Sequence, residues 1–288
     1  MGEAEPPSSG QAIPGSDYTG KMPVTRVRFA CVLFALIAVA CRSDEVTLSY
    51  EYETGQTLRY TMEATAHAEW DIGGAGEGSY RWAAEVFERV EEVDDEGALV
   101  EVTLAPTEVE EKGLLSPGSD EKTFSIRIDD KGRVLEVIEI DGVPAEDLDP
   151  EEVAFIGTYR PPLPTDTIRL REEWVAPPPP ITQEGFQQLV SLVELDRLDR
   201  DADGRMASIS YSGESPLTRT TTLPEGDAEL AGSASISGEA IVDLDGGFLR
   251  ESTTTTEGDF EVRALPSNEG SPLSGSLHQV LELHLERI

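Results

Sequence analysis

Apolar and polar side chains alternate along most of the chain that follows residue 45. In the first such segment, Val46, Leu48, Tyr50 and Tyr52 are separated by polar residues. A period of two places one face of a strand in a core and the other in water. The same period recurs at residues 58–62, 80–86, 99–104, 124–128, 134–140, 206–211, 234–244, 248–255, 260–264 and 281–285. The alternation predicts antiparallel strands with one wet face rather than a buried parallel sheet.

Acidic residues and glycines stand between these segments, where hairpins need turns. Such clusters occur at residues 94–97, 129–132, 203–204 and 245–247. Glycine accepts the positive φ of a tight turn, and an aspartate carboxylate can accept hydrogen bonds from the turn backbone. Only residues 144–156 and 183–195 are candidates for short helices. The sequence thus predicts an all-β fold: an antiparallel meander that forms a curved sheet, half-barrel or sandwich, with few short helices.

A weak internal similarity points to two related halves. Residues 93–102 resemble residues 198–209, and the hairpin at 128–135 matches the one at 242–249 in the same order. Generic hairpins would also look alike, so duplication and chance similarity both stay open.

Two proline-rich stretches, residues 160–164 and 177–180, separate these halves. Consecutive prolines favour a stiff polyproline II strap and cannot continue a sheet. The strap is either a linker between the halves or a rigid crossover packed on the sheet. In the second case Trp174, which lies between the two stretches, would be a buried anchor.

The N-terminal region has the three parts of a secretion signal. Lys21, Arg26 and Arg28 supply positive charge, and residues 29–40 then run without a charge or a proline. That run is too short to span a bilayer core of about 30 Å comfortably as a helix. Residues 1–21 show no apolar periodicity, and we interpret them as a disordered extension or as the result of a misplaced start codon before Met22.

The apolar run ends in the sequence Ala38-Val39-Ala40-Cys41. It resembles the lipobox of bacterial lipoproteins, although the usual first residue is leucine. The resemblance implies a diacylglycerol on the Cys41 sulfur and cleavage before that cysteine, and two or three acyl chains anchor a protein stably. Arg42 follows in place of the aspartate that often marks inner-membrane retention, which favours the outer membrane. The alternative is a secreted protein cleaved after Ala40, with Cys41 as a free thiol.

The predicted organisation therefore has five parts. They are an extension over residues 1–21, a lipoprotein signal peptide over 22–40, a first β half over 41–160, a proline-rich strap over 161–182 and a second β half over 183–288. Cys31 lies in the signal peptide, so Cys41 is the only cysteine left after cleavage and no intramolecular disulfide can form.

The formal net charge is -35 at pH 7. A field this negative repels nucleic-acid phosphates and anionic lipid headgroups, and it attracts cations or a basic partner. Apolar residues make up 38% of the chain, and together with the clean alternation this fraction indicates a folded core rather than disorder.

No sequence signature of catalysis is present: the chain has no Gly-x-Ser-x-Gly elbow, phosphate loop or dinucleotide fingerprint. The histidines, His67, His278 and His284, show no zinc-ligand spacing and are predicted to be surface or turn residues. We therefore predict a protein that is not an enzyme and has no cofactor.

One short motif leaves calcium open. Asp199, Asp201, Asp203 and Gly204 match positions one, three, five and six of an EF-hand loop. Position twelve is Ser210 instead of a glutamate, and the flanking residues are predicted to be strands rather than helices. The motif is therefore either a weak calcium site or an acidic hairpin turn.

The order of several motifs resembles a family of uncharacterised bacterial lipoproteins that carry an all-β domain of unknown function. The matching positions are Tyr52, Gly55 and Tyr60, the hairpin at 93–102, residues 131–134, the proline-rich lead from Pro164 to Trp174, the strand at 238–241 and the turn at 245–247. The family usually has a glycine three residues before the tryptophan, where this chain has Arg171. The resemblance implies an exported all-β domain and no known activity.

Two functional hypotheses follow. The first is a membrane-anchored exported lipoprotein of the cell envelope that binds an apolar ligand, such as a lipid, or another envelope protein. The second is an acidic surface module for adhesion or scaffolding that binds calcium or a basic partner.

Overall fold

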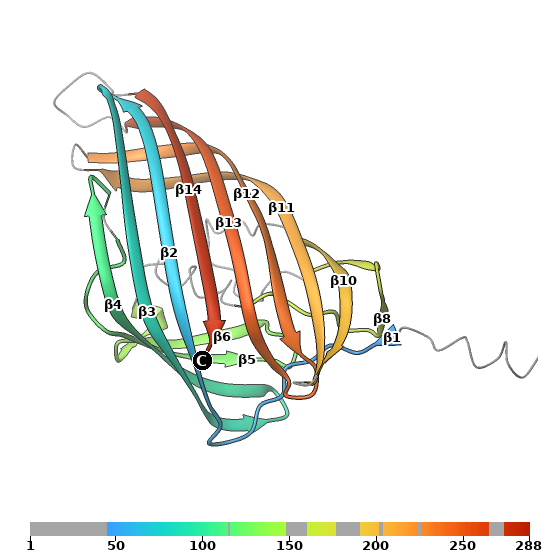
Figure 1. Ribbon diagram of the computed structural model, residues 1–288. Helices are drawn as coiled ribbons and strands as arrows, with labels where there is room; N and C mark the ends of the chain where they lie inside the picture. Colours follow the sequence, from blue (N-terminus) through green and yellow to red (C-terminus); the bar gives the residue numbers. More distant parts are fainter. Residues whose placement is uncertain are drawn as a thin grey trace, which may run out of the picture. The chain divides into compact units, whose positions relative to one another are not determined.

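The computed structural model describes residues 45–114, 116–147, 160–176, 191–201, 204–223, 226–264 and 274–288. The chain divides into two units, Met1–Ser43 and Asp44–Ile288, and every described residue belongs to the second. An antiparallel sheet of twelve strands dominates this unit (Figure 1). Its strand order is β7-β6-β5-β4-β3-β2-β14-β13-β12-β11-β10-β9. The predicted all-β fold and antiparallel meander are thereby confirmed.

Most strands of this sheet are long. Their bounds are β2 Thr57–Ile72, β3 Ala75–Asp94, β4 Gly97–Lys112, β5 Lys122–Ile128, β6 Val134–Ile140, β7 Val143–Pro144, β9 Glu173–Val175, β10 Ser191–Asp201, β11 Gly204–Leu223, β12 Gly226–Asp243, β13 Phe248–Ala264 and β14 Ser274–Arg287. A second sheet of two strands pairs β1, Glu45–Val46, with β8, Ile168–Arg169. No described residues form a helix long and apolar enough to cross a membrane.

The centre of the large sheet joins the first and last long strands, since β2 pairs with β14 from Tyr60 to Ile72. Across the sheet, β7 to β2 is followed by β14 to β9, so each strand corresponds to the one seven places later in the chain. Both pairs of similar hairpins fit this offset: β3–β4 matches β10–β11, and β5–β6 matches β12–β13. Duplication stays a prediction, and the topology is the one it would produce.

The predicted turns lie between paired strands because their aspartates hold the turn backbone. The Asp94 carboxylate accepts hydrogen bonds from the backbone N–H groups of Glu96, at 2.8 Å, and Gly97, at 3.1 Å. Between β12 and β13, Asp243 accepts from Asp245 and Gly246 in the same way, at 3.0 and 2.8 Å. These local contacts explain why the turn positions could be predicted from the sequence.

The main hydrophobic core lies on one face of the sheet, here named the inner face. The core lies at the end of the sheet that carries the β3–β4 turn. There, alternate residues of β2 such as Leu58, Tyr60 and Met62 are buried. Two segments outside the large sheet add Leu48 and Leu163 to this core. The opposite end of the sheet carries the β2–β3 turn at Gly73 and is named the Gly73 end.

The predicted strand over residues 46–52 is wrong beyond Val46. Residues 47–56 form no strand, and their backbone instead bonds to turns of the large sheet. The N–H of Tyr50 donates to the Asp130 carbonyl, and that of Glu51 donates to the Gly247 carbonyl, both at 2.7 Å. The alternation arose because Leu48 and Tyr50 are buried against the core while their neighbours are not.

Neither predicted helix is found in the described residues. Of residues 144–156, Pro144 ends β7, Ala145–Asp147 form one 3-10 turn, and the rest lie outside the described residues. Of residues 183–195, the described part is the start of strand β10. Val193 and Leu195 are buried while Leu192 is exposed, which is strand periodicity.

The backbone at Arg171, three residues before Trp174, has a conformation that suits glycine. Arg171 has φ of 66° and is one of two non-glycine residues with positive φ among those described. Glycine adopts this conformation at little steric cost. Trp174 itself lies on the edge strand β9, half-buried and packed against the core, as expected of an anchor. Residues 177–180 lie outside the described residues.

Candidate functional site

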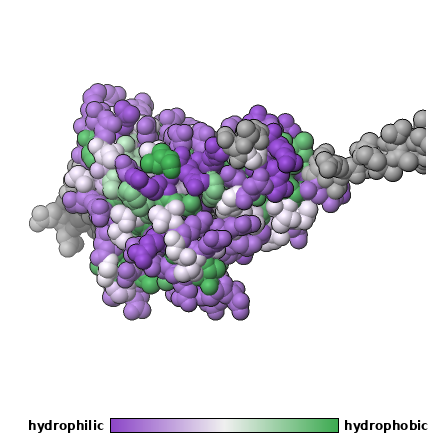
Figure 2. Space-filling model, turned by 60° about the horizontal axis from the view of Figure 1, so that its bottom comes forward, coloured by the Kyte–Doolittle hydropathy of each residue, from purple (hydrophilic) through white to green (hydrophobic). Residues whose placement is uncertain are grey.

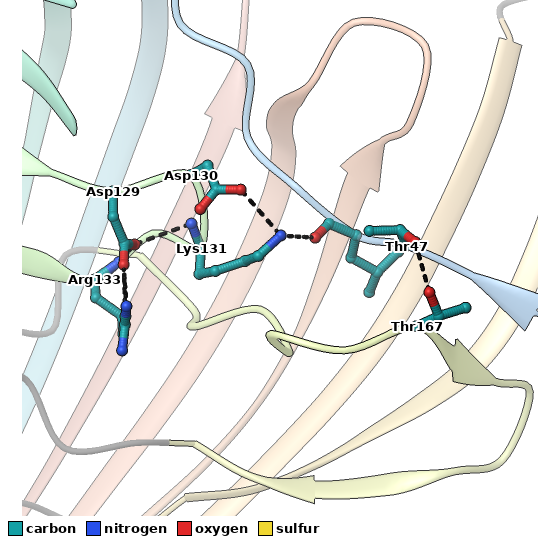
Figure 3. Close-up of polar contacts among 7 residues, drawn as sticks. Thr47, Asp129, Asp130, Lys131, Arg133 and Thr167 are labelled. Carbon is teal, nitrogen blue, oxygen red and sulfur yellow. Dashed lines mark hydrogen bonds and ion pairs between the residues drawn. The ribbon is translucent and has the colours of Figure 1, made fainter. Parts of the chain in front are cut away.

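Hydrogen bonds attach the N-terminal segment to the core a few residues after Glu45, the first described residue. The Lys131 ammonium donates to the Leu48 carbonyl at 2.9 Å and pairs with Asp130 at 3.1 Å (Figure 3). The hydroxyls of Thr47 and Thr167 lie 2.9 Å apart. These five residues, here named the tether clamp, join the N-terminal segment to the β5–β6 turn and to the segment before β8.

The β5–β6 turn that carries Lys131 is organised by the neighbouring Asp129. One Asp129 oxygen accepts the backbone N–H groups of Lys131 and Arg133, both at 2.9 Å. The other accepts the Arg133 Nε–H at 2.6 Å (Figure 3). The Lys131 side chain is thus directed to the Leu48 carbonyl by a turn with its own internal bonds.

A buried ion pair lies behind the clamp. The guanidinium of Arg160 donates to the Glu88 carboxylate, and both side chains are at most 5% exposed. Glu88 lies on the inner face, because it pairs with buried Leu58 across β2 and β3. The Arg160 guanidinium carbon also lies 5.1 Å from the Tyr50 ring centre and 5.9 Å from that of Tyr52. The pair therefore connects the large sheet to two crossing segments outside it, one that carries Tyr50 and Tyr52 and one that carries Arg160.

Tyrosines surround this ion pair and remain neutral. Burial raises the pKa of Tyr50, Tyr52 and Tyr60 well above the ordinary value, although the nearby Arg160 charge opposes the shift. The Tyr50 hydroxyl donates to the Pro161 carbonyl at 3.2 Å. The hydroxyls of Tyr52 and Tyr60 have no hydrogen-bond partner among the described residues. The cluster is enclosed by the core, and its geometry indicates a structural role.

The inner face stays apolar beyond the main core. Toward the Gly73 end, Ala66 and Ala68 of β2 are buried. A second, smaller cluster follows, formed by Leu230, Ala234, Phe260 and Val262, with Ile72 and Leu277 packed against it. Strand β2 thus carries apolar side chains on this face along almost its whole length, whereas the inner face of β13 also carries Ser252, Thr254 and Thr256. The apolar row on β2 is the kind of surface that an apolar ligand would need.

The outer face of the sheet is acidic at the Gly73 end. A depression of about 880 Å³ there is lined by two cross-strand rows, one containing Glu69, His278 and Asp259 and the next containing Asp71 and Glu261. These side chains alternate with the buried ones and so point away from the core. With Glu77, five carboxylates line this acidic trough, and its lining contains no lysine or arginine.

Of the residues that the sequence predicts for calcium binding and lipidation, only Asp199 and Asp201 belong to the described part of the chain. Asp199 lies on β10, where its carboxylate pairs with Arg197 at 2.5 Å, and Asp201 ends that strand opposite Gly204. Asp203 and Cys41 lie outside the described residues. Calcium binding by the aspartates and lipidation of Cys41 therefore remain predictions.

The sequence did not indicate the grouping of His278 with Glu257 and Asp259. One ligand atom from each of these side chains lies within 4.8 Å of the others. The sequence could have predicted only part of this grouping. Alternation places each residue on the outer face, but the pairing of β13 with β14 decides that they lie close together.

Hydrophilic residues cover most of the molecular face in Figure 2, and the hydrophobic residues form separate patches among them. This distribution agrees with the net charge of -35.

Comparisons with known proteins find similarity to solved structures. No family model matches the chain, and no curated protein matches it. A solved structure described as "Lipid-protein interactions in lipovitellin" is similar, with a TM-score of 0.47 and 11% sequence identity over 83% of this chain. The chain spans about a quarter of that structure's chain, since the match covers 25% of it.

Proposed function

We propose that this protein is a non-enzymatic lipoprotein of a bacterial cell envelope, anchored by acyl chains on Cys41 and directed to the outer membrane. The observation that carries the proposal is the uncharged run of residues 29–40 that ends directly at Cys41. The tether clamp supports it. Only Arg42, Ser43 and Asp44 separate Cys41 from the strand β1, and the clamp joins the following residues to the core. A domain held by such a short tether would stay close to the membrane surface.

Replacing the proposed anchor residue tests this function. The variant Cys41→Ser is expected to move the protein from the membrane fraction to the soluble fraction, because acyl chains account for nearly all of its membrane affinity. Fractionation of cells and the mass of the mature protein are the measurements. Cys31→Ser is the matched control, since it changes a cysteine of the signal peptide and should leave the protein on the membrane. Membrane retention of Cys41→Ser would contradict the anchor.

For the ligand, we propose an apolar molecule such as a lipid, bound against the inner face toward the Gly73 end. The main core fills the other end of that face with side chains such as Tyr60 and Leu163. Toward the Gly73 end, the inner face carries the small buried residues Ala66 and Ala68 and then the second cluster. A row of apolar side chains that includes small alanines suits a chain-like apolar ligand.

Native mass spectrometry of the full-length Cys41→Ser protein tests this ligand, because the variant should be purified without detergent. We expect a population heavier than the protein by the mass of a lipid, which disappears when the protein is unfolded. The extract of the unfolded sample should contain the same molecule. A ligand-free mass in repeated preparations would exclude the carrier and leave the proposed anchor unaffected.

A further inference from the structure

Three side chains with metal-binding groups converge on the outer face, beside the acidic trough. Glu257 and Asp259 lie on β13, and His278 lies on β14. The Asp259 carboxylate is 2.9 Å from Nδ1 of His278, and the Glu257 carboxylate is 4.0 Å from Nε2. Each ring nitrogen thus faces a carboxylate oxygen.

The strand register brings these groups together. Asp259 is directly opposite His278 in the pairing of β13 with β14, and Glu257 is two residues away on the same face. Opposite residues on antiparallel strands have Cβ atoms about 5 Å apart, close enough for their side chains to bind one ion. All three side chains are at least 36% exposed, so they can close around an ion without moving the backbone.

The local charge favours a cation. Among the described residues, neither Glu257 nor Asp259 has a lysine or arginine within ion-pair distance, and their only ion pairs are with His278. Other outer-face carboxylates are paired with arginine, such as Glu85 with Arg59 at 3.0 Å. The adjoining trough adds the carboxylates of Glu69, Asp71 and Glu77, while its Glu261 is paired with Arg263 at 2.9 Å. A divalent cation would neutralise the two carboxylates.

The donor set selects the class of metal. One imidazole nitrogen and two carboxylates are ligands for zinc and related first-row transition ions, whereas calcium and magnesium bind oxygen ligands. We propose that Glu257, Asp259 and His278 form a binding site for a divalent transition-metal ion on the outer face. Bound metal would link β13 to β14 and stabilise the folded state by mass action. The site does not depend on the apolar ligand or on the acyl anchor.

Zinc titration of the full-length protein tests the proposal, with Cys31 and Cys41 replaced by serine so that no thiol competes. Isothermal titration calorimetry is expected to show Zn²⁺ binding that His278→Gln weakens at least about tenfold. The matched control is His284→Gln, because His284 also lies on the outer face of β14, 3.9 Å from Glu286. This control should bind as the parent does.

The site would be overturned if the parent bound no zinc, if both histidine variants lost zinc affinity equally, or if zinc binding were unchanged in His278→Gln. Calcium added in tenfold excess should not displace the zinc, and displacement would also contradict an imidazole ligand. Circular dichroism of each variant confirms that loss of binding is not loss of fold. Glu257→Gln should weaken binding without changing the spectrum.

Discussion

Replacing Glu88 with alanine is expected to lower the free energy of unfolding by about 3–5 kcal/mol. The substitution removes the carboxylate that contacts the guanidinium of Arg160, a residue that is 5% exposed. Removing one partner of a buried ion pair is costly, because the charge that stays buried loses part of its compensation, and the neighbouring tyrosines stay neutral and cannot replace the lost anion. Urea denaturation of the purified protein measures the loss.

Two variants separate this effect from a general weakening of strand β3. Glu85→Ala removes an exposed carboxylate from the same strand, at 3.0 Å from Arg59, and should cost at most about 1 kcal/mol. Replacing both Glu88 and Arg160 with methionine should recover part of the stability, because an apolar pair removes both of these buried charges. Equal losses in Glu88→Ala and Glu85→Ala would show that the buried pair has no special role.

Replacing Gly132 with alanine is expected to cost about 2–5 kcal/mol, since it adds a backbone strain of about 1–2 kcal/mol and an overpacking cost of about 1–3 kcal/mol. Gly132 has φ of 77°, and a Cβ there would lie 2.5 Å from Cε2 of Tyr50. The Tyr50 ring is 2% exposed and its hydroxyl bonds to Pro161, so it cannot move aside freely. The same contact holds the N-terminal segment beside the tether clamp.

Gly142→Ala is the matched control for this prediction. Gly142 also has φ of 77°, but a Cβ there would meet no atom within 4 Å. The control should therefore show the backbone strain alone, and the difference between the two variants measures the contact with Tyr50. Denaturation midpoints at an unchanged slope provide the comparison. Identical losses would mean that Tyr50 adapts to the added methyl group.

The two predictions concern one region of the core, beside the tether clamp. Glu88 and Gly132 both contact the crossing segments that carry Tyr50 and Arg160. If the protein is anchored through Cys41, the N-terminal segment must stay attached to the core under any load on the membrane tether. Weakening the contacts of Arg160 and Tyr50 with the core should then lower the free energy of unfolding without altering the strands themselves.

The sequence by itself determined the local features of this protein. Alternation revealed the faces of the long strands, and the Asp–Gly clusters marked the turns, because both depend on neighbours within a few residues. It also placed Cys41 after an apolar run, which is a linear signal. The alternation in residues 47–52 predicted a strand that is not there, because burial of every second side chain produces the same pattern whether or not a strand partner is present.

Tertiary structure alone decided which distant residues meet. Glu88 appeared as one more charged position, and its burial depends on Arg160, which is 72 residues away. His278 joined Glu257 and Asp259 only through the register of β13 on β14. Lys131 reaches Leu48 across 83 residues of sequence. A period of two assigns each residue to a face, but long-range pairing chooses its neighbours there, and that pairing depends on the packing of the whole sheet.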